Sequence, residues 1–192
     1  MAAPVRRPGS YEDILALPEH LVGELIDGEL FVQSRPAGPH TEAASVLTMD
    51  LGSAFHRGRG GPGGWIFLDE PELHLRHDIL VPDLAAWRRE RLPEVPSTAF
   101  LTLAPDWVCE VLSPSTARKD RQRKIPIYAR EQVRHVWLVD PVARFVEVLR
   151  LEGPSYLHAA VFGEEERARI EPFDAIELEL AALWPNAKDD AG

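Results

Sequence analysis

Apolar residues recur along the first third of the chain at spacings typical of helices and of strands. Between His40 and Phe55, apolar side chains return every three or four positions, which predicts an amphipathic helix. Upstream, "SYEDILALPE" opens with the capping residue Ser10 and predicts a short helix. "GELIDGELFVQ" places Asp27 and Gly28 between two apolar runs, as in a two-residue hairpin turn. The chain is therefore expected to open with a helix, a hairpin and a longer helix.

Most of the remaining sequence is rich in residues that favour strands. The segments with this character are "GWIFLDEPELHLR", "DILVPDLAAW", "DWVCEVLS", "HVWLVDP" and "RFVEVLRL", followed by the shorter "YLHAAVF" and "AIELEL". The glycine-rich "RGRGGPGG" predicts a loop. A helical pattern between Ser115 and Glu131 contains Pro126, which should kink or interrupt the helix.

This mixture of elements predicts an α+β fold in which helices flank a mixed β-sheet. A chain of 192 residues fits one domain with a sizeable core. We place that domain at residues 11–184, with short tails at 1–10 and 185–192. The hydrophobic fraction of 45% and the charged fraction of 27% are those of an ordinary soluble globular protein.

Cysteine content and hydropathy bear on the compartment. The single cysteine, Cys109, excludes an intramolecular disulfide and favours a reducing environment. No segment of the sequence approaches the roughly 18 consecutive apolar residues of a membrane span. We therefore expect a cytoplasmic protein without a membrane partner.

Positive charge is concentrated in one short segment. The formal net charge of -10 disfavours a protein that coats nucleic acid nonspecifically, because phosphates are repelled at long range. Yet five of the 21 lysines and arginines fall within positions 118 to 124. Lys119 and Lys124 are also two of only three lysines in the chain. The two lysines in this segment indicate either a specific need for an ammonium group at these positions or a chance distribution.

The segment "WVCEVL" carries one acid, Glu110, in an otherwise apolar strand. Side chains alternate across a strand, so Glu110 shares a face with Val108 and Leu112. An ionised carboxylate is costly to bury unless it is paired or bound to a cation. Taken alone, Glu110 is interpreted as a half-exposed residue at the strand end or as the partner of an arginine.

A second acid changes that interpretation. Asp83 follows the apolar run "ILVP", so another strand also delivers a carboxylate. Two carboxylates on neighbouring strands form a typical oxygen-rich site for Mg²⁺ or Mn²⁺. A metal in such a site can generate hydroxide and stabilise the charge that develops during phosphate hydrolysis.

The basic segment has a helical face that could complete this site. Asp120, Lys124 and Tyr128 are spaced four residues apart and lie on one side of a continuous helix. The short connection "SPST" returns this helix against the preceding strand, so that Lys124 could point at Glu110. The alternative is a charged helical face exposed to solvent.

The order "VPD", "CEVLSPST", "KDRQRKIPIYA", "VWLVDP" resembles the Uma-two family of restriction endonucleases, within the PD-(D/E)xK nuclease superfamily. The resemblance extends from about Tyr11 to Trp184 and implies a restriction-endonuclease-like core. In the superfamily pattern the lysine follows the glutamate by two residues, a position that Leu112 occupies here. The family takes its lysine from the following helix, which matches Lys124. Gln132 stands where the family has a glycine, so the end of that helix is expected to differ locally.

The resemblance implies a metal-dependent endonuclease that cleaves DNA, or RNA through the same site, and acts as a homodimer. Asp83 and Glu110 would hold Mg²⁺ or Mn²⁺, assisted by the Val111 carbonyl. Lys124 would orient or activate the attacking water and offset phosphate charge. Phosphate contacts are expected from three arginines of the basic segment, Arg118, Arg121 and Arg123.

Several assignments stay open at the level of sequence. Glu24 either orients a ligand, a water or a second metal, or is a surface acid beside the hairpin. His40 either contacts phosphate or caps its helix. Ser113 or Ser115 as a nucleophile with His135 is disfavoured, because the sequence has no nucleophile-elbow motif. The competing function is a non-catalytic nuclease-fold binding or assembly module, which the acidic net charge and the lack of a separate DNA-recognition domain favour.

Overall fold

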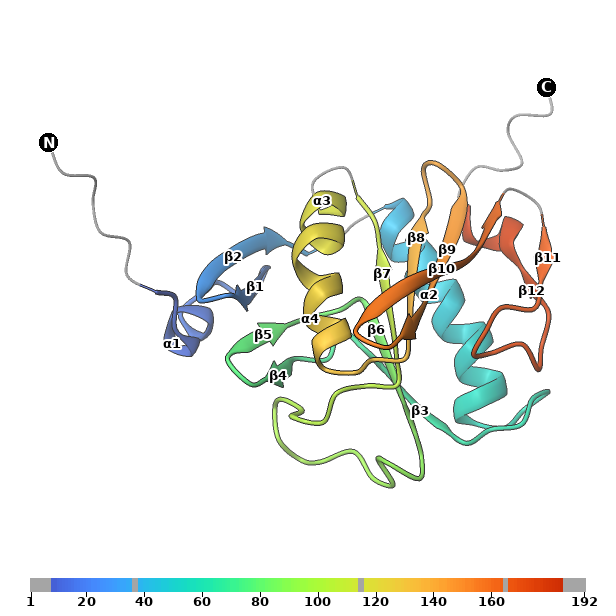
Figure 1. Cartoon of the computed structure of the whole chain (residues 1–192), viewed down its shortest axis with the longest axis horizontal. Coiled ribbons are helices and arrows are strands. Elements are labelled where there is room, and N and C mark those ends of the chain that lie inside the picture. The colour runs from blue at the N-terminus through green and yellow to red at the C-terminus, as the bar shows by residue number, and fades with distance from the viewer. Residues whose placement is uncertain (1–7, 36–37, 114–115, 164–165, 185–192) are drawn as a thin grey trace, which may run out of the picture.

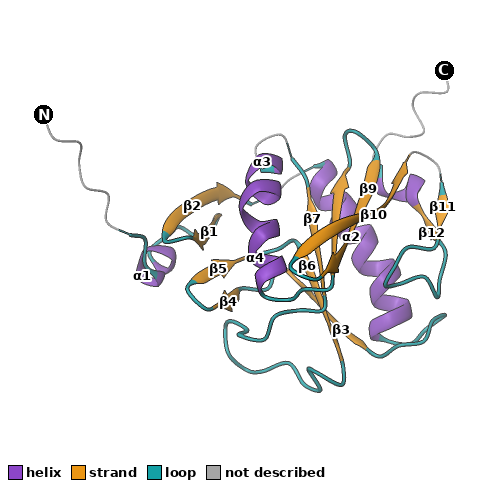
Figure 2. Ribbon diagram, viewed as in Figure 1, coloured by secondary structure: helices purple, strands orange, loops and turns teal. Residues whose placement is uncertain are grey.

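A six-stranded mixed sheet carries the main core of the protein (Figures 1 and 2). The computed structural model describes residues 8–35, 38–113, 116–163 and 166–184. The strand order is β10-β9-β8-β7-β6-β3, and only β7 and β8 pair in parallel. The strands are β3 (Trp65–Asp69), β6 (Leu84–Arg88), β7 (Trp107–Val111), β8 (His135–Asp140), β9 (Phe145–Glu152) and β10 (Ser155–Gly163). The expected α+β class with a mixed sheet is confirmed.

A smaller sheet of four strands lies beside the first, in the order β2-β1-β5-β4. Its members are β1 (Leu21–Ile26), β2 (Glu29–Ser34), β4 (Leu73–Leu75) and β5 (Asp78–Leu80), and β11 (Arg167–Ala168) and β12 (Leu178–Glu179) form a separate pair. Asp27 and Gly28 join β1 to β2 with φ angles of 52° and 77°. Two positive φ angles are what a tight two-residue hairpin turn requires, so the predicted hairpin is correct.

Helices cover both faces of the larger sheet. They are α1 (Tyr11–Leu15), α2 (Pro39–Leu51) with its π-helical extension η1 (Gly52–His56), then α3 (Ala117–Lys119), the π-helical turn η2 (Asp120–Lys124) and α4 (Ile125–Arg130), and last the 3-10 turn η3 (Leu180–Leu183). None of the helices described is long and apolar enough to cross a membrane. The tail residues 1–7 and 185–192, and Ser115, lie outside the described part of the chain.

The predicted interruption near Pro126 takes the form of η2, a π-helical turn just before that proline. Proline has no N–H to donate to the preceding turn, which favours such an irregularity. The segment "AIELEL" is less strand-like than predicted: only Leu178–Glu179 pair with another strand, and Leu180 begins η3. The alanines that follow Leu180 are poor strand formers.

Strand β7 is buried on both faces because a helix packs on each. Trp107, Cys109 and Val111 belong to the core beneath α2, whereas Val108 and Leu112 belong to the core beneath α4. This is the alternation predicted from the sequence. Figure 1 shows the α3–α4 helix between the β1–β2 hairpin and the larger sheet. The acid of β7 therefore faces a helix and a second sheet rather than solvent.

Gln132 adopts a glycine-like backbone at the end of α4. Its φ is 61°, in the left-handed region that favours glycine.

Gln132→Gly is expected to raise the free energy of unfolding by about 0.5–1 kcal/mol, because it relieves that strain. The same change at Gln122, inside η2, is expected to lower it by about 1 kcal/mol. Urea unfolding of both variants measures the two shifts, and equal signs would contradict the assigned backbone at Gln132.

Candidate functional site

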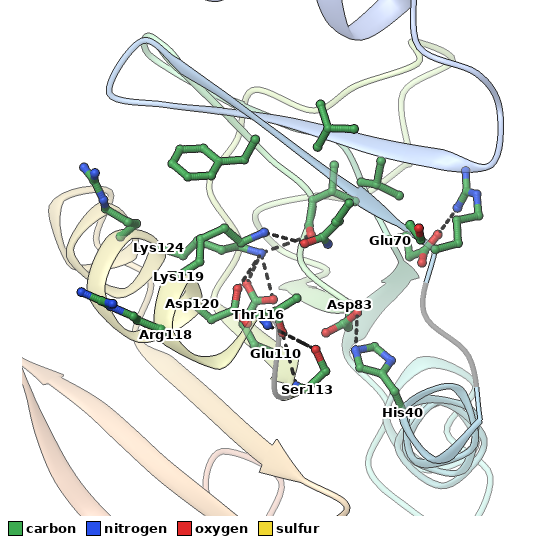
Figure 3. Close-up of a pocket in the computed structure, with 18 of the residues that line it drawn as sticks. His40, Glu70, Asp83, Glu110, Ser113, Thr116, Arg118, Lys119, Asp120 and Lys124 are labelled. Atoms are coloured by element: carbon green, nitrogen blue, oxygen red, sulfur yellow. Dashed lines mark hydrogen bonds and ion pairs between the residues drawn. The ribbon is translucent and has the colours of Figure 1, made fainter.

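A cavity of about 860 Å³ opens between the β1–β2 hairpin, the start of the α3–α4 helix and the ends of β6 and β7 (Figure 3). Six of the residues selected from the sequence line it: His40, Asp83, Glu110, Arg118, Arg123 and Lys124. Glu24 does not line the cavity, but its carboxylate contacts the lining residue Lys124. Arg121 is not among the lining residues; its guanidinium pairs with Glu147 at 2.6 Å instead.

Antiparallel pairing of β6 and β7 brings the first acid to the second strand. Leu84 is opposite Cys109 in the register, so Asp83 comes next to the end of β7. Its Oδ2 accepts a hydrogen bond of 2.7 Å from the backbone N–H of Val111. On the other side, the backbone N–H of Glu70 donates to the Asp83 carbonyl oxygen at 2.9 Å. Asp83 is thus fixed by backbone contacts from two directions.

The Glu110 carboxylate is held by two side chains of the α3–α4 helix. Lys124 Nζ lies 2.8 Å from Glu110 Oε1 and 2.9 Å from Oε2. The Tyr128 hydroxyl donates to Oε1 as well. Asp120 lies on the same helical face, with Oδ1 3.8 Å from Lys124 Nζ. The predicted face of Asp120, Lys124 and Tyr128 therefore points into the protein, and the solvent-exposed alternative is wrong.

Glu24 is completely buried, so it is not a surface acid beside the hairpin. Its Oε1 lies 3.0 Å from Lys124 Nζ and accepts a 2.9 Å hydrogen bond from the Val81 N–H. Its Oε2 accepts a 2.6 Å hydrogen bond from Lys119 Nζ, which also donates to Gln33 Oε1 at 2.7 Å. Sequence reasoning did not select Lys119 as a site residue. The scarcity of lysine elsewhere in the chain was the signal that pointed to it.

The buried charges perturb one another. Burial raises the pKa of Glu110 well above its usual range and outweighs the opposing effect of Lys124. Burial also raises the pKa of Asp120. For Glu24, burial would raise the pKa, but Lys124 and Lys119 outweigh it and the pKa is lowered. Burial would lower the pKa of Lys124, but Glu110 and Glu24 raise it well above its ordinary value. Lys124 is therefore a cation at neutral pH and cannot accept a proton there.

His40 faces Asp83 from the first turn of α2 (Figure 3). Its Nε2 lies 3.3 Å from Asp83 Oδ1. Burial lowers the pKa of His40, but hydrogen bonds to Asp83 and to the Val111 backbone raise it above the usual value overall. The cap residue of α2 is Gly38, and no side chain caps the helix. The capping role considered for His40 is therefore wrong.

The arginines differ in their surroundings because the helix turns them in different directions. Arg118 lines the cavity and its Nε donates to Gln122 Oε1 at 3.1 Å. Arg123 also lines the cavity, 3.6–3.7 Å from the exposed acids Asp27 and Glu29. Both therefore lie where they can meet an anion in the cavity, whereas Arg121 pairs with Glu147 outside it.

The Ser–His alternative finds no support in the contacts that are described. His135 Nε2 faces Glu171 Oε2 at 3.8 Å. Ser113 Oγ instead forms a 3.0 Å hydrogen bond with Thr116 Oγ1. Ser113 is thus engaged in the turn that starts the α3–α4 helix.

Oxygen donors for a divalent cation are present, but they are not gathered in a three-acid cluster. Among the described residues, one group of three potential ligand side chains has its atoms within 4.8 Å of one another: Asp27, His77 and Asp78. It lies outside the cavity, and Arg130 Nη2 already pairs with Asp78 at 2.7 Å. Asp83 and Glu110 both line the cavity, and carboxylate oxygens are ligands of the kind that hard cations prefer.

Comparison with known proteins identifies a similar fold and a family for this chain. A crystal structure titled as a "putative nuclease belonging to DUF820", from Anabaena variabilis ATCC 29413, is similar with a TM-score of 0.74 and 23% identity, covering 92% of this chain and 98% of that chain. The model of the Uma2 family, described as "Putative restriction endonuclease", matches residues 11–182. The chain belongs to this family, which confirms the resemblance seen in the sequence. No curated protein matches it.

Glu24→Gln is expected to lower the free energy of unfolding at pH 7 by about 3 kcal/mol, because the buried Lys124 and the half-buried Lys119 lose their shared carboxylate. The folded pKa of Glu24 is depressed, so its contribution is present above the unfolded pKa of about 4.3 and is lost as pH falls below it. The difference in the free energy of unfolding between variant and wild type should therefore become smaller in acid. Denaturant unfolding between pH 3 and 7 measures this difference. Glu29→Gln, at an exposed position of β2, serves as the control and should change stability by less than about 0.5 kcal/mol.

Proposed function

We propose that the cavity is the active site of a metal-dependent endonuclease that hydrolyses DNA phosphodiester bonds. The observation that carries the proposal is the meeting of Asp83, Glu110 and Lys124 at one cavity that three arginines also line. The chain's membership of a family described as restriction endonucleases supports the same conclusion.

In this proposal Asp83, Glu110 and the Val111 carbonyl would hold Mg²⁺ or Mn²⁺. Such a cation supplies Lewis-acid stabilisation of phosphate charge and lowers the pKa of water. Glu110 would have to share an oxygen that now accepts a hydrogen bond from Lys124 or Tyr128. His40, against Asp83, would contact the phosphate or a water beside it.

Lys124 would act as a fixed cation. Because Glu110 and Glu24 hold it protonated, it would donate hydrogen bonds to the attacking water and to the phosphate oxygens rather than remove a proton. Glu24 would position Lys124 through their 3.0 Å contact. Arg118 and Arg123, which line the cavity, would contact phosphates on either side of the scissile bond.

The metal ligands can be tested by calorimetry with Mn²⁺. Wild type is expected to bind Mn²⁺, and Asp83→Asn and Glu110→Gln are expected to lose that binding while remaining folded in a thermal melt. Asp27→Asn is the matched control, because it removes an acid from the other possible cluster. If Asp27→Asn loses Mn²⁺ binding and Asp83→Asn keeps it, the metal binds at the cluster of Asp27, His77 and Asp78, and the proposed site is wrong.

Lys124→Met should lower the single-turnover rate of DNA cleavage by a factor of about 10²–10³, the range for loss of one transition-state contact. Metal binding should persist, because lysine is not a ligand.

Arg118→Ala and Arg123→Ala should instead reduce the salt dependence of DNA binding by about 0.9 per lost phosphate contact. Arg121→Ala should leave the salt dependence unchanged, because Arg121 pairs with Glu147 outside the cavity. A change in Arg121→Ala equal to that in Arg118→Ala would contradict the assignment.

The second candidate function is a non-catalytic nuclease-fold module that binds a partner. It is favoured by one observation: both oxygens of Glu110 already accept hydrogen bonds within the protein. Nucleic-acid binding without Mn²⁺ binding or cleavage would support this function.

Parallel assays on DNA and RNA identify the substrate of the proposed nuclease. Sedimentation tests the expected homodimer, which cleavage of both strands of a duplex favours.

A further inference from the structure

A second cavity of about 410 Å³ lies beside Asp83, on the side of α2. Four residues line both this cavity and the candidate active site: Arg35, His40, Glu70 and Asp83. The two cavities therefore adjoin at the carboxylate that we propose as a metal ligand. A substrate bound in the first cavity would have direct access to the second.

One face of α2 forms a wall of this second cavity. Thr41, Ala44, Ser45, Thr48 and Met49 line it at the three- and four-residue spacing of a single helical face. Met49 is 63% exposed, although it is a large apolar side chain. Together with Ala44 and Leu84 it offers an apolar surface to a flat ring, and methionine adapts well to such contacts.

Another part of the lining is acidic. Asp69 and Glu70 line the cavity, and Asp69 Oδ1 accepts a 2.8 Å hydrogen bond from Thr48 Oγ1, which fixes the carboxylate against α2. Arg35 is the one lysine or arginine in the lining, and it pairs with Glu70. A phosphate would be repelled here, whereas the first cavity carries Arg118, Lys119, Arg123 and Lys124.

Size and chemistry together indicate the ligand. A volume of about 410 Å³ is near the lower end of the roughly 300–1,000 Å³ typical of small-molecule sites, and suits one nucleoside rather than a length of duplex. An apolar wall packs against the face of a base, and a carboxylate accepts hydrogen bonds from the exocyclic amino groups of bases. Thymine has no such amino group.

We propose that the second cavity is a base subsite: it takes the base of one unpaired nucleotide next to the phosphate held in the first cavity, and Asp69 selects bases that carry an amino group. This inference rests on the proposed nuclease function, because it needs a nucleic acid in the first cavity. It adds a selectivity for one nucleotide position that metal and phosphate contacts alone do not provide.

Fluorescence anisotropy with short single-stranded DNA tests the subsite in EDTA, where metal-dependent cleavage cannot occur. An abasic site is moved one position at a time along the oligonucleotide. For wild type, one position should weaken binding by about fivefold or more, the low end of the range for the stacking of one base. A flat profile, or no binding of any oligonucleotide, would overturn the proposal.

Filling the cavity provides the matched comparison. Ser45→Trp places an indole in the subsite from an exposed position of α2, and should remove the dependence on the abasic position. Ser53→Trp makes the same change at an exposed η1 residue that lines neither cavity, and should behave like wild type. An unchanged profile in Ser45→Trp would overturn the subsite. Metal-dependent cleavage by wild type would still support the nuclease function in that case, so the two failures are distinguishable.

The role of Asp69 is tested at the position that the abasic scan identifies. Wild type should bind cytosine there about fivefold more tightly than thymine, at the low end of discrimination by base-edge hydrogen bonds. Asp69→Asn should remove this preference, since an amide can also donate to a thymine carbonyl. Asp50→Asn, an exposed acid of α2 outside the lining, is the control. A preference that persists in Asp69→Asn would overturn the selection by this carboxylate.

Discussion

The buried contact between Glu110 and Lys124 joins the parts of this structure. Glu110 belongs to β7 of the larger sheet, and Lys124 ends η2 of the helix that covers it. Lys124 also reaches Glu24 on β1, so one ammonium group links the larger sheet, the helix and the smaller sheet. A buried charge that loses its partner costs about 3–5 kcal/mol. The contact between Glu110 and Lys124 therefore helps to fix how the hairpin and the helix lie against β7.

The charges around this contact do not balance. Three buried carboxyl groups, on Glu24, Glu110 and Asp120, surround Lys119 and Lys124. Burial and the repulsion among the acids raise the pKa of Glu110 and of Asp120, as expected when negative charge exceeds positive charge in a region of low dielectric. A divalent cation next to Glu110 and Asp83 would offset this excess. The same feature that is unfavourable for folding thus favours metal binding in the proposed function.

Local chemistry made much of this arrangement predictable from the sequence. The hairpin at Asp27-Gly28, the alternation along β7 and the helical face of Lys124 follow from short-range periodicities that tertiary packing preserved. The placement of Glu24, His40 and Arg121 was not predictable, because it depends on how separate elements pack. Glu24 is buried only because the smaller sheet folds against the α3–α4 helix. Arg121 is directed away from the cavity by the winding of η2, which the sequence indicates only through Pro126.

Net charge is a poor guide to whether this protein binds nucleic acid. The formal charge of -10 acts at long range, yet at about 0.1 M salt exposed charges separated by more than roughly 10 Å are largely screened. What remains is the charge at short range. Lys119 and Lys124 are committed to buried carboxylates, which leaves Arg118 and Arg123 as the cavity's adjustable cations on the α3–α4 helix. Few phosphate contacts imply a weak salt dependence and a modest electrostatic affinity. Substrate affinity in the proposed function must therefore come largely from contacts to the base, which a second cavity beside Asp83 can supply.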